Sequence, residues 1–458
     1  MKPAALNVLE KDAVAIVGPQ DSTTAHIISV ISNGLQIPVL SFAAADPTLT
    51  SLQYPFFLRM TQSDSHQMAA MADFINYYGW RQVIGIYVDN EYGRNGIESL
   101  GGELAKKMSK IYKIALPLGT SRDHMMDVLH KSNVIGPRVY VVHATPDSGL
   151  EIFSVAQQLQ MMTDEYVWLV TDWLCTVLDV SESVVHLLNH LQGIVGFCQY
   201  VPESSQKSIF SSKWEELRRK GMVTSKLNAY GFYAYDTVWA VAYAINSFLK
   251  ESGNITFTNN DNLVNMKGIV PFDKFKSFNG GHLLLQKFLR LNFTGLVGQF
   301  QFGSDQNLKS GTYQIVNVDG NMINAVGYWA NHLGLTISLP NSVHGNNRRN
   351  FSENQILRNI TWPGGKTKTP RGWVVATSDK PLRIAVPHRV SFVEFVTVLE
   401  DNHTVKGYCI DVFEAALKLV PYYVPHEFVP FGDGHSSPSY WNLVNMVADQ
   451  VTAPHLFF

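Results

Sequence analysis

The stretch Asp12–Leu49, DAVAIVGPQDSTTAHIISVISNGLQIPVLSFAAADPTL, predicts one complete βαβ unit. Its opening run, Asp12–Gly18, is rich in apolar and β-branched residues and ends at a Gly-Pro pair, as expected of a strand followed by a turn. Isoleucines then recur at helical spacing up to Leu35. A second apolar run, Ile37–Ala44, is typical of a buried strand. Two parallel strands joined by a crossover helix are the economical arrangement.

Four polar residues, Asp21 to Thr24, stand where the predicted helix begins. Open α/β sheets bind small, usually anionic, ligands where the carboxyl end of a strand meets the N-terminus of the next helix. Ser22 and Thr23 are therefore candidate ligand-binding residues. The alternative is that these side chains only cap the free amides of the first helical turn.

The composition is that of a globular chain of two to three domains. It has 458 residues, of which 46% are hydrophobic and 16% charged, with a net charge of −2. This charge gives no electrostatic reason to expect a nucleic-acid partner. No signal peptide is visible, and no run has the roughly 18 apolar residues that a membrane helix needs. The nearest run, Tyr230–Leu249, contains Asp236 and Asn246 and suits a core helix better.

The three cysteines, Cys175, Cys198 and Cys409, are too few for a disulfide framework. We expect them to be reduced and buried, as free cysteines often are. A bond between Cys175 and Cys198 is the alternative.

Beyond the opening unit, predicted helices and strands alternate. A helix at Ser63–Tyr78 precedes a strand at Gln82–Val88, a polar turn at Asp89–Gly93 and a helix from Gly96. The strand Tyr166–Thr171 comes later in the series. Six alternations over about 160 residues predict a parallel, doubly wound sheet.

The alternation ends near Gly193. Antiparallel strands are predicted between Gly295 and Trp329, after the helix that begins at Tyr230. The stretch Asn341–Arg371 is rich in Asn, Gly, Arg and Pro without periodicity, which is typical of a linker. A fresh strand at Leu382 then opens a second module.

Several motifs resemble those of plant glutamate receptor-like channels, which are built on the plan of the ionotropic glutamate receptors. In the first module they are AIVGPQ, IPVLSFAAADPTL, YPFFLRMTQSD, GWRQVIGIYVDNEYGRNGI and TDWL. YAYDTVWAVAYAI, GLVGQFQF, ITWPGG, PRGWVV, LRIAVPHRVSFVEFV, GYCIDVFEAA and FVPFGDG follow. The resemblance runs from about Ala5 to Val451.

This resemblance implies an α/β fold in successive parts. Residues 1–335 are expected to form a bilobed clamshell like a type I periplasmic-binding protein, with its first strand-helix repeat missing. Residues 336–380 are expected to be a linker, and 381–451 the incomplete first segment of a ligand-binding domain like a type II periplasmic-binding protein. Residues 452–458 match nothing in the family. We therefore expect a chain truncated at both ends, without the pore.

The implied function is the extracellular, ligand-sensing portion of a ligand-gated, non-selective, calcium-permeable cation channel. The resemblance implies an amino-acid ligand, no cofactor, and assembly with sister subunits as a tetramer. It places the protein in the plasma membrane, with membrane contact only through the missing channel segment.

The resemblance also implies site residues. Related type I modules that bind amino acids, such as the metabotropic receptors, carry a tyrosine at the position of Tyr92 and an acidic residue at that of Asp172, which pairs with the ligand's ammonium group. Asp64 matches another acidic position at the cleft. Ala45 stands where those relatives have a ligand-binding hydroxyl. The alternatives are structural: a packed ring for Tyr92, a turn for Asp172 and a helix cap for Asp64.

In the second module, Asp433, Gly434 and Ser436 match a loop that carries agonist contacts in animal receptors. The alternative is a solvated loop. The sequence predicts no metal site, because no paired-cysteine spacing or shared histidine face occurs.

Two other classes of function compete with the receptor. An enzyme is disfavoured because Gly364-Gly365-Lys366-Thr367 lacks the earlier glycine of a phosphate loop, whose position is occupied by Ile360. No Gly-x-Ser-x-Gly or Gly-x-Gly-x-x-Gly motif occurs either. A soluble type I solute-binding protein for amino acids or similar small polar ligands is the main alternative. Such a protein should end near residue 335.

Overall fold

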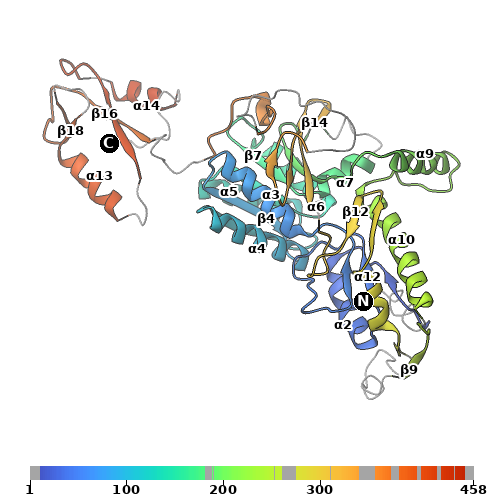
Figure 1. The fold of residues 1–458 in the computed structure, drawn as a ribbon. Coiled ribbons are helices and arrows are strands. Elements are labelled where there is room, and N and C mark those ends of the chain that lie inside the picture. The colour runs from blue at the N-terminus through green and yellow to red at the C-terminus, as the bar shows by residue number, and fades with distance from the viewer. Residues whose placement is uncertain are drawn as a thin grey trace. The chain divides into compact units, whose positions relative to one another are not determined.

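The computed structural model describes residues 11–180, 188, 190–251, 253–259, 275–309, 311–339, 356–372, 381–399, 404–419, 424–437 and 439–448. The chain forms two compact units, Met1–Gly372 and Trp373–Phe458, each of which is described by itself. Figure 1 shows the first unit built from two lobes, each with its own sheet.

The opening stretch forms the predicted βαβ unit in the first lobe. Strand β1 (Ile16–Val17) pairs in parallel with β2 (Val39–Ser41), and helix α2 (Ser22–Leu35) connects them. Strand β3 (Phe57–Arg59) extends the sheet on the other side of β2. The strands are shorter than predicted, but their order and direction are confirmed.

The first lobe is completed by segments that come much later in the chain. Helices α10 (Ala229–Lys250) and α12 (Gly281–Leu289) pack against its sheet. Two antiparallel pairs join them: β9 (Phe257–Asn259) with β10 (Lys276–Phe278), and β11 (Asn292–Gly295) with β12 (Gly298–Gln301). Their shared core includes Leu40, Leu58, Tyr233, Phe248, Phe278, Leu284 and Phe300.

The second lobe holds an eight-stranded sheet of order β15-β14-β13-β8-β7-β6-β4-β5. Its parallel part is β4 (Gln82–Val88), β5 (Lys110–Leu116), β6 (Val139–His143), β7 (Val167–Val170) and β8 (Val195–Gln199). Its antiparallel part is β13 (Thr312–Asp319), β14 (Met322–Ala330) and β15 (Gly334–Thr336).

Among the described residues, six helices belong to this part of the chain. They are α3 (Asp64–Tyr77), α4 (Glu91–Lys106), α5 (Arg122–Ile135), α6 (Pro146–Gln158), α7 (Trp173–Val180) and α9 (Ser205–Arg219). The buried core of the lobe includes Ile84, Tyr140, Phe153, Trp168 and Leu174.

Two predictions about this region were wrong in detail. The alternating strands form two sheets rather than one, because the chain leaves the first lobe after β3. Helix α4 begins at Glu91, not at Gly96, because the Asn90 side chain accepts a hydrogen bond from the Gly93 amide at 2.9 Å. The predicted polar turn is therefore the first turn of the helix.

The chain crosses between the lobes after β3, after β8 and after β12, and side-chain hydrogen bonds join these crossings. Thr61 donates to the Gln199 side-chain carbonyl at 3.0 Å. Gln62 donates to the Tyr233 hydroxyl at 3.3 Å. Adjacent crossings of this kind form a hinge about which two lobes can close.

Cys175 and Cys198 form a disulfide bond, with Cα atoms 5.7 Å apart. The prediction that both are reduced was wrong, and the alternative pairing is confirmed. The reason is topological: β7 pairs with β8, so the helix that follows β7 passes beside β8. Cys409, partly buried, is free.

The stretch interpreted as a linker is packed over residues 356–372. Trp362 and Ile360 are buried, and the Trp80 indole donates to the Pro370 carbonyl at 3.1 Å. A short 3₁₀ turn, η2 (Pro363–Gly365), follows Trp362. The predicted linker therefore differs from the structure here, because its apolar residues cover the second lobe. Residues 340–355 and 373–380 lie outside the described residues.

Replacing Gly193 by alanine should detach this packed segment. Gly193 has φ +82°, and an added Cβ would lie 2.0 Å from the Pro363 nitrogen. We expect a loss of about 2–4 kcal/mol in the free energy of unfolding, from left-handed strain and the clash together. Urea unfolding and proteolysis within 356–372 measure both effects.

Gly221→Ala is the matched control, since Gly221 has φ +70° with nothing within 4 Å of the added Cβ. In this variant the free energy of unfolding should fall by only about 1 kcal/mol, the cost of the left-handed backbone conformation for alanine. Equal losses in the two variants would contradict the packing described.

The second unit is small. Strands β16 (Leu382–Pro387) and β19 (His426–Phe431) pair in parallel, with α13 (Tyr408–Lys418) between them in the chain. A short pair, β17 (Thr397–Val398) with β18 (Val405–Lys406), and helix α14 (Tyr440–Ala448) complete it. Ile384, Val386, Ile410 and Phe413 form its core. The predicted tail, 452–458, lies outside the described residues.

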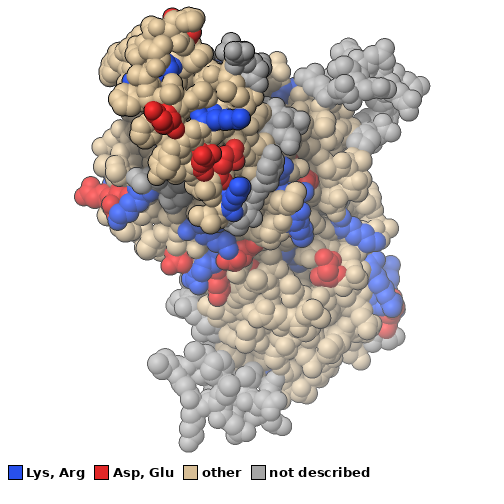
Figure 2. Space-filling model, turned by 90° about the vertical axis from the view of Figure 1, so that its left-hand side faces the viewer, with Lys and Arg blue, Asp and Glu red and all other residues tan. Residues whose placement is uncertain are grey.

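Among the described residues drawn on the face in Figure 2, basic and acidic side chains are interspersed rather than gathered by sign. Within the described parts of the chain, no helix combines the length and the apolar character that a membrane span requires.

Candidate ligand-binding cleft

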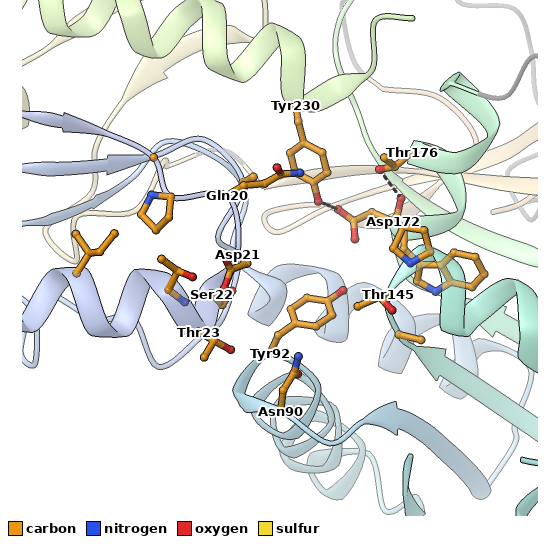
Figure 3. Close-up of a pocket in the computed structure, with 18 of the residues that line it drawn as sticks. Gln20, Asp21, Ser22, Thr23, Asn90, Tyr92, Thr145, Asp172, Thr176 and Tyr230 are labelled. Carbon is orange, nitrogen blue, oxygen red and sulfur yellow. Dashed lines mark hydrogen bonds between the residues drawn. The ribbon is translucent and has the colours of Figure 1, made fainter. Parts of the chain in front are cut away.

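A cleft of about 660 Å³ lies between the two lobes of the first unit. Figure 3 shows the N-terminus of α2 facing the start of α4, with Asp172 beside them. The lining residues are Ile16, Val17, Gly18, Pro19, Gln20, Asp21, Ser22, Thr23, Thr24, Ile28, Ala43, Asn90, Tyr92, Ala144, Thr145, Pro146, Asp172, Trp173, Thr176 and Tyr230.

The first lobe contributes the N-terminus of α2. Asp21 is the N-cap, and its carboxylate accepts a hydrogen bond from the Thr24 amide at 2.8 Å. The predicted residues Ser22 and Thr23 therefore do not cap the helix. The Ser22 hydroxyl instead accepts from the Asp46 amide at 3.3 Å, and Thr23 is exposed in the cleft.

The second lobe contributes Tyr92 from the first turn of α4. Its ring packs on His143, with ring centroids 4.1 Å apart. His143 Nε2 donates to the Tyr92 carbonyl at 3.2 Å, and Nδ1 lies 3.1 Å from the Thr171 hydroxyl. Burial lowers the pKa of His143 to about 4, so this imidazole is neutral at neutral pH. Burial also raises the pKa of Tyr92, so its hydroxyl stays protonated.

Asp172 lies between the lobes, directly after β7. Its Oδ2 accepts from the Tyr230 hydroxyl at 2.7 Å and from the Gln199 amide at 3.0 Å. Tyr230 belongs to α10 of the first lobe, so Asp172 connects the two lobes, as Figure 3 shows. Burial raises the pKa of Asp172, while hydrogen bonds from Tyr230 and Gln199 lower it in part.

Asp64 does not line the cleft and lies behind its wall. It is buried, and its Oδ2 has no hydrogen-bond partner among the described residues. The same oxygen lies 3.9 Å from His143 Nε2. Burial, then the charge of Asp172, raises the pKa of Asp64 well above its ordinary value. Ser63, not Asp64, caps α3.

A polar cluster joins the lobes beside the cleft. Asn95 of α4 donates to Asp46 Oδ2 at 2.9 Å and to the Thr48 hydroxyl at 3.1 Å. His26 of α2 lies 2.8 Å from the same carboxylate oxygen. Buried Arg59 donates to the Asp46 and Leu49 carbonyls. Of these contacts, those of Asn95 join the two lobes, because His26, Asp46, Thr48 and Arg59 all belong to the first lobe.

Residues 2–321 match the family described as receptor family ligand binding region. The chain is 49% identical over 450 residues to glutamate receptor 3.7 of Arabidopsis thaliana, covering 98% of this chain and 48% of that protein. This chain belongs to the plant glutamate receptor-like family. It spans about half the length of the curated relatives it matches.

Two further glutamate receptor-like relatives support the assignment. Glutamate receptor 3.4 of Arabidopsis thaliana is 47% identical over 97% of this chain and 46% of its own length. Glutamate receptor 3.1 of Oryza sativa subsp. japonica is 44% identical over 97% of this chain and 48% of its own. The family model confirms the type I clamshell for the first unit. The relatives are receptors, so the chain is not an enzyme.

In the second unit of this glutamate receptor-like chain, the three predicted residues lie together in the loop after β19. Asp433 Oδ1 accepts from the amides of His435 and Ser436, at 2.9 and 2.8 Å, and from the Ser436 hydroxyl at 2.9 Å. These hydrogen bonds lower the pKa of Asp433 to about 2. Gly434 allows the turn with φ +72°.

Sequence reasoning missed several lining residues of the glutamate receptor-like cleft, above all Tyr230 and Trp173. Tyr230 begins an aromatic helix, and its spacing resembles that of core residues. A usable signal did exist for Asn90, Thr145 and Trp173. Each follows a parallel strand at its carboxyl end, the edge where such sheets bind ligands. Ala45 is buried and absent from the lining, whereas Ala43 is part of it.

Proposed function

We propose that the first unit senses a small amino acid by closing its two lobes on the ligand. The observation that carries this proposal is the position of Asp172, which lies buried in the cleft beside Tyr92 and Tyr230 and opposite the N-terminus of α2. The carboxylate on one side of the cleft is complementary to the ammonium group of an amino acid. The helix N-terminus on the other side is complementary to its carboxylate.

The ammonium end of the ligand is assigned to Asp172. An ammonium group is attracted both to a carboxylate and to the faces of aromatic rings. Tyr92 and Tyr230 reach the same space from opposite lobes, as Figure 3 shows. Asp64 has no assigned contact with the ligand, because it lies behind the wall with its Oδ2 3.9 Å from His143 Nε2.

The carboxylate end is assigned to the N-terminus of α2. The free amides and the helix dipole favour an anion there. Ser22 and Thr23 add hydroxyl groups at the same point. Because Asp21 performs the capping, Thr23 is left to face a ligand, and the Ser22 hydroxyl, which accepts from the Asp46 amide, keeps its hydrogen to donate.

The proposed whole protein is a ligand-gated, non-selective, calcium-permeable cation channel of the plasma membrane, with this region on the extracellular side and sister subunits completing a tetramer. Residues 1–335 would be its amino-terminal sensing domain, 336–380 a connection, and 381–451 the first segment of a second ligand-binding domain. In that segment Asp433, Gly434 and Ser436 would form an agonist loop. The identity to plant glutamate receptors, which continues through the second unit, favours this function over a soluble solute-binding protein.

Isothermal titration of amino acids into the full chain tests this proposal. We expect one ligand per first unit, and an affinity that falls about tenfold in the Ser22→Ala, Thr23→Ala double variant, which removes two hydrogen-bonding groups. Thr258→Ala, an exposed hydroxyl on β9, is the matched control and should leave binding unchanged. Absence of binding by every amino acid would contradict the proposal.

A further inference from the structure

The charge of the cleft wall is unusual for a site that would take an acidic ligand. Its lining includes two carboxylates, Asp21 and Asp172, and the described lining contains no lysine, arginine or histidine. The buried cation Arg59 does not line the cleft, and it donates to the Asp46 and Leu49 carbonyls. His143, behind Tyr92, is neutral because burial lowers its pKa.

Helix N-termini do not replace a missing cation for a second carboxylate. Helices α4 and α6 also begin at the cleft, but each has an acidic residue in its first turn, Glu91 and Asp147 respectively. Pro146, the first residue of α6, has no amide hydrogen to donate. Helices α7 and α10 have no acidic residue in their first turns, but both begin at Asp172, which precedes α7 and accepts a hydrogen bond from the Tyr230 hydroxyl of α10. The proposed function assigns the N-terminus of α2 to the α-carboxylate.

The remaining wall is suited to an uncharged side chain. Val17, Pro19, Ile28, Ala43 and Ala144 line the cleft together with hydroxyl groups such as those of Thr145 and Thr176. A carboxylate placed against these groups would lose its hydration without gaining a cationic partner, which is costly. An amide or an apolar group meets no such cost.

We propose that the cleft selects monocarboxylic amino acids with uncharged side chains and rejects the dicarboxylic ones. This inference rests on the proposed function, because it assumes that an amino acid occupies the cleft. It names Asp21 as a specificity-determining residue, because this carboxylate lines the cleft and would repel a second carboxylate on the ligand.

Titration of the twenty protein amino acids into the full chain tests the selectivity. Glutamine and glutamate, like asparagine and aspartate, are nearly equal in shape and differ in charge. We expect each dicarboxylic amino acid to bind at least about thirtyfold more weakly than its amide, as for a buried unpaired charge. Binding confined to uncharged amino acids supports the inference. Equal or tighter binding of a dicarboxylic or basic amino acid, relative to the best uncharged one, overturns it.

The Asp21→Asn variant tests the assigned residue. Asparagine retains the oxygen that caps the Thr24 amide, so the helix should keep its start while losing the charge. We expect glutamate binding to improve about three- to tenfold relative to that of an uncharged ligand. Asp123→Asn, in the first turn of α5 and outside the cleft, should change neither. An unchanged ratio for Asp21→Asn overturns its role. Binding by no amino acid contradicts the proposed function instead.

Discussion

Replacement of Asp172 by asparagine is expected to abolish amino-acid binding, with a loss of affinity of about a hundredfold or more. The substitution keeps the size of the side chain and an oxygen to accept from Tyr230 and Gln199. It removes the negative charge that the ligand's ammonium group would meet, and an unpaired charge in a buried site costs about 3–5 kcal/mol. Isothermal titration measures the loss.

Two control measurements separate a loss of ligand contact from a loss of folding. Asp147→Asn removes an acidic residue from the first turn of α6, where the side chain is exposed, and should leave affinity unchanged. A thermal melt of Asp172→Asn without ligand should match the parent chain or exceed it, because burial raises the pKa of this carboxyl and disfavours its charge. A folded Asp172→Asn chain that binds within fivefold of the parent would refute the assigned role.

Acidification is expected to destabilise the first unit through His143. Burial holds the pKa of this histidine at about 4 in the folded chain, against about 6.5 when unfolded. The unfolded chain therefore binds the proton first, and stability present above pH 6.5 is lost as the pH falls towards 4. The full loss is about 3 kcal/mol. Urea unfolding between pH 7.5 and 4.5 measures it.

The variant His143→Gln isolates this effect. Glutamine does not titrate and can still donate to the Tyr92 carbonyl, so the difference in slope from the parent reports the histidine alone. The comparison is needed because Asp64 acts with the opposite sign: burial raises its pKa, so its contribution to stability falls as the pH rises. His124→Gln, on an exposed face of α5, is the control. Identical slopes for parent and His143→Gln would contradict the burial described.

Local sequence signals predicted the elements well where hydrophobic spacing and caps agree. Strand β4 occupies the predicted residues, and α3 begins after Ser63 as expected. The βαβ unit at the start was predicted for the same reason. The division of the strands into two sheets could not be predicted from the alternation of strands and helices. This alternation is the same whether the strands form one sheet or two. Only the family resemblance implied two lobes.

The candidate cleft was predicted in part. Ser22 and Thr23, predicted from the start of the helix, line one cleft with Tyr92 and Asp172, which the resemblance implied. Asp64 lies behind this cleft. Tyr230 could not be found from sequence, because its contact with Asp172 joins residues 58 positions apart in different lobes. The disulfide was missed for a similar reason. Cys175 and Cys198 become neighbours only through the pairing of β7 with β8.

A ligand-bound structure of the full chain tests the central claim most directly. The amino acid with the highest affinity in the titrations should be used. The account predicts its ammonium nitrogen at about 3 Å from the Asp172 carboxylate and its α-carboxylate at the N-terminus of α2, against Ser22 and Thr23. A ligand bound outside this cleft, or bound with its carboxylate towards Asp172, would contradict the account.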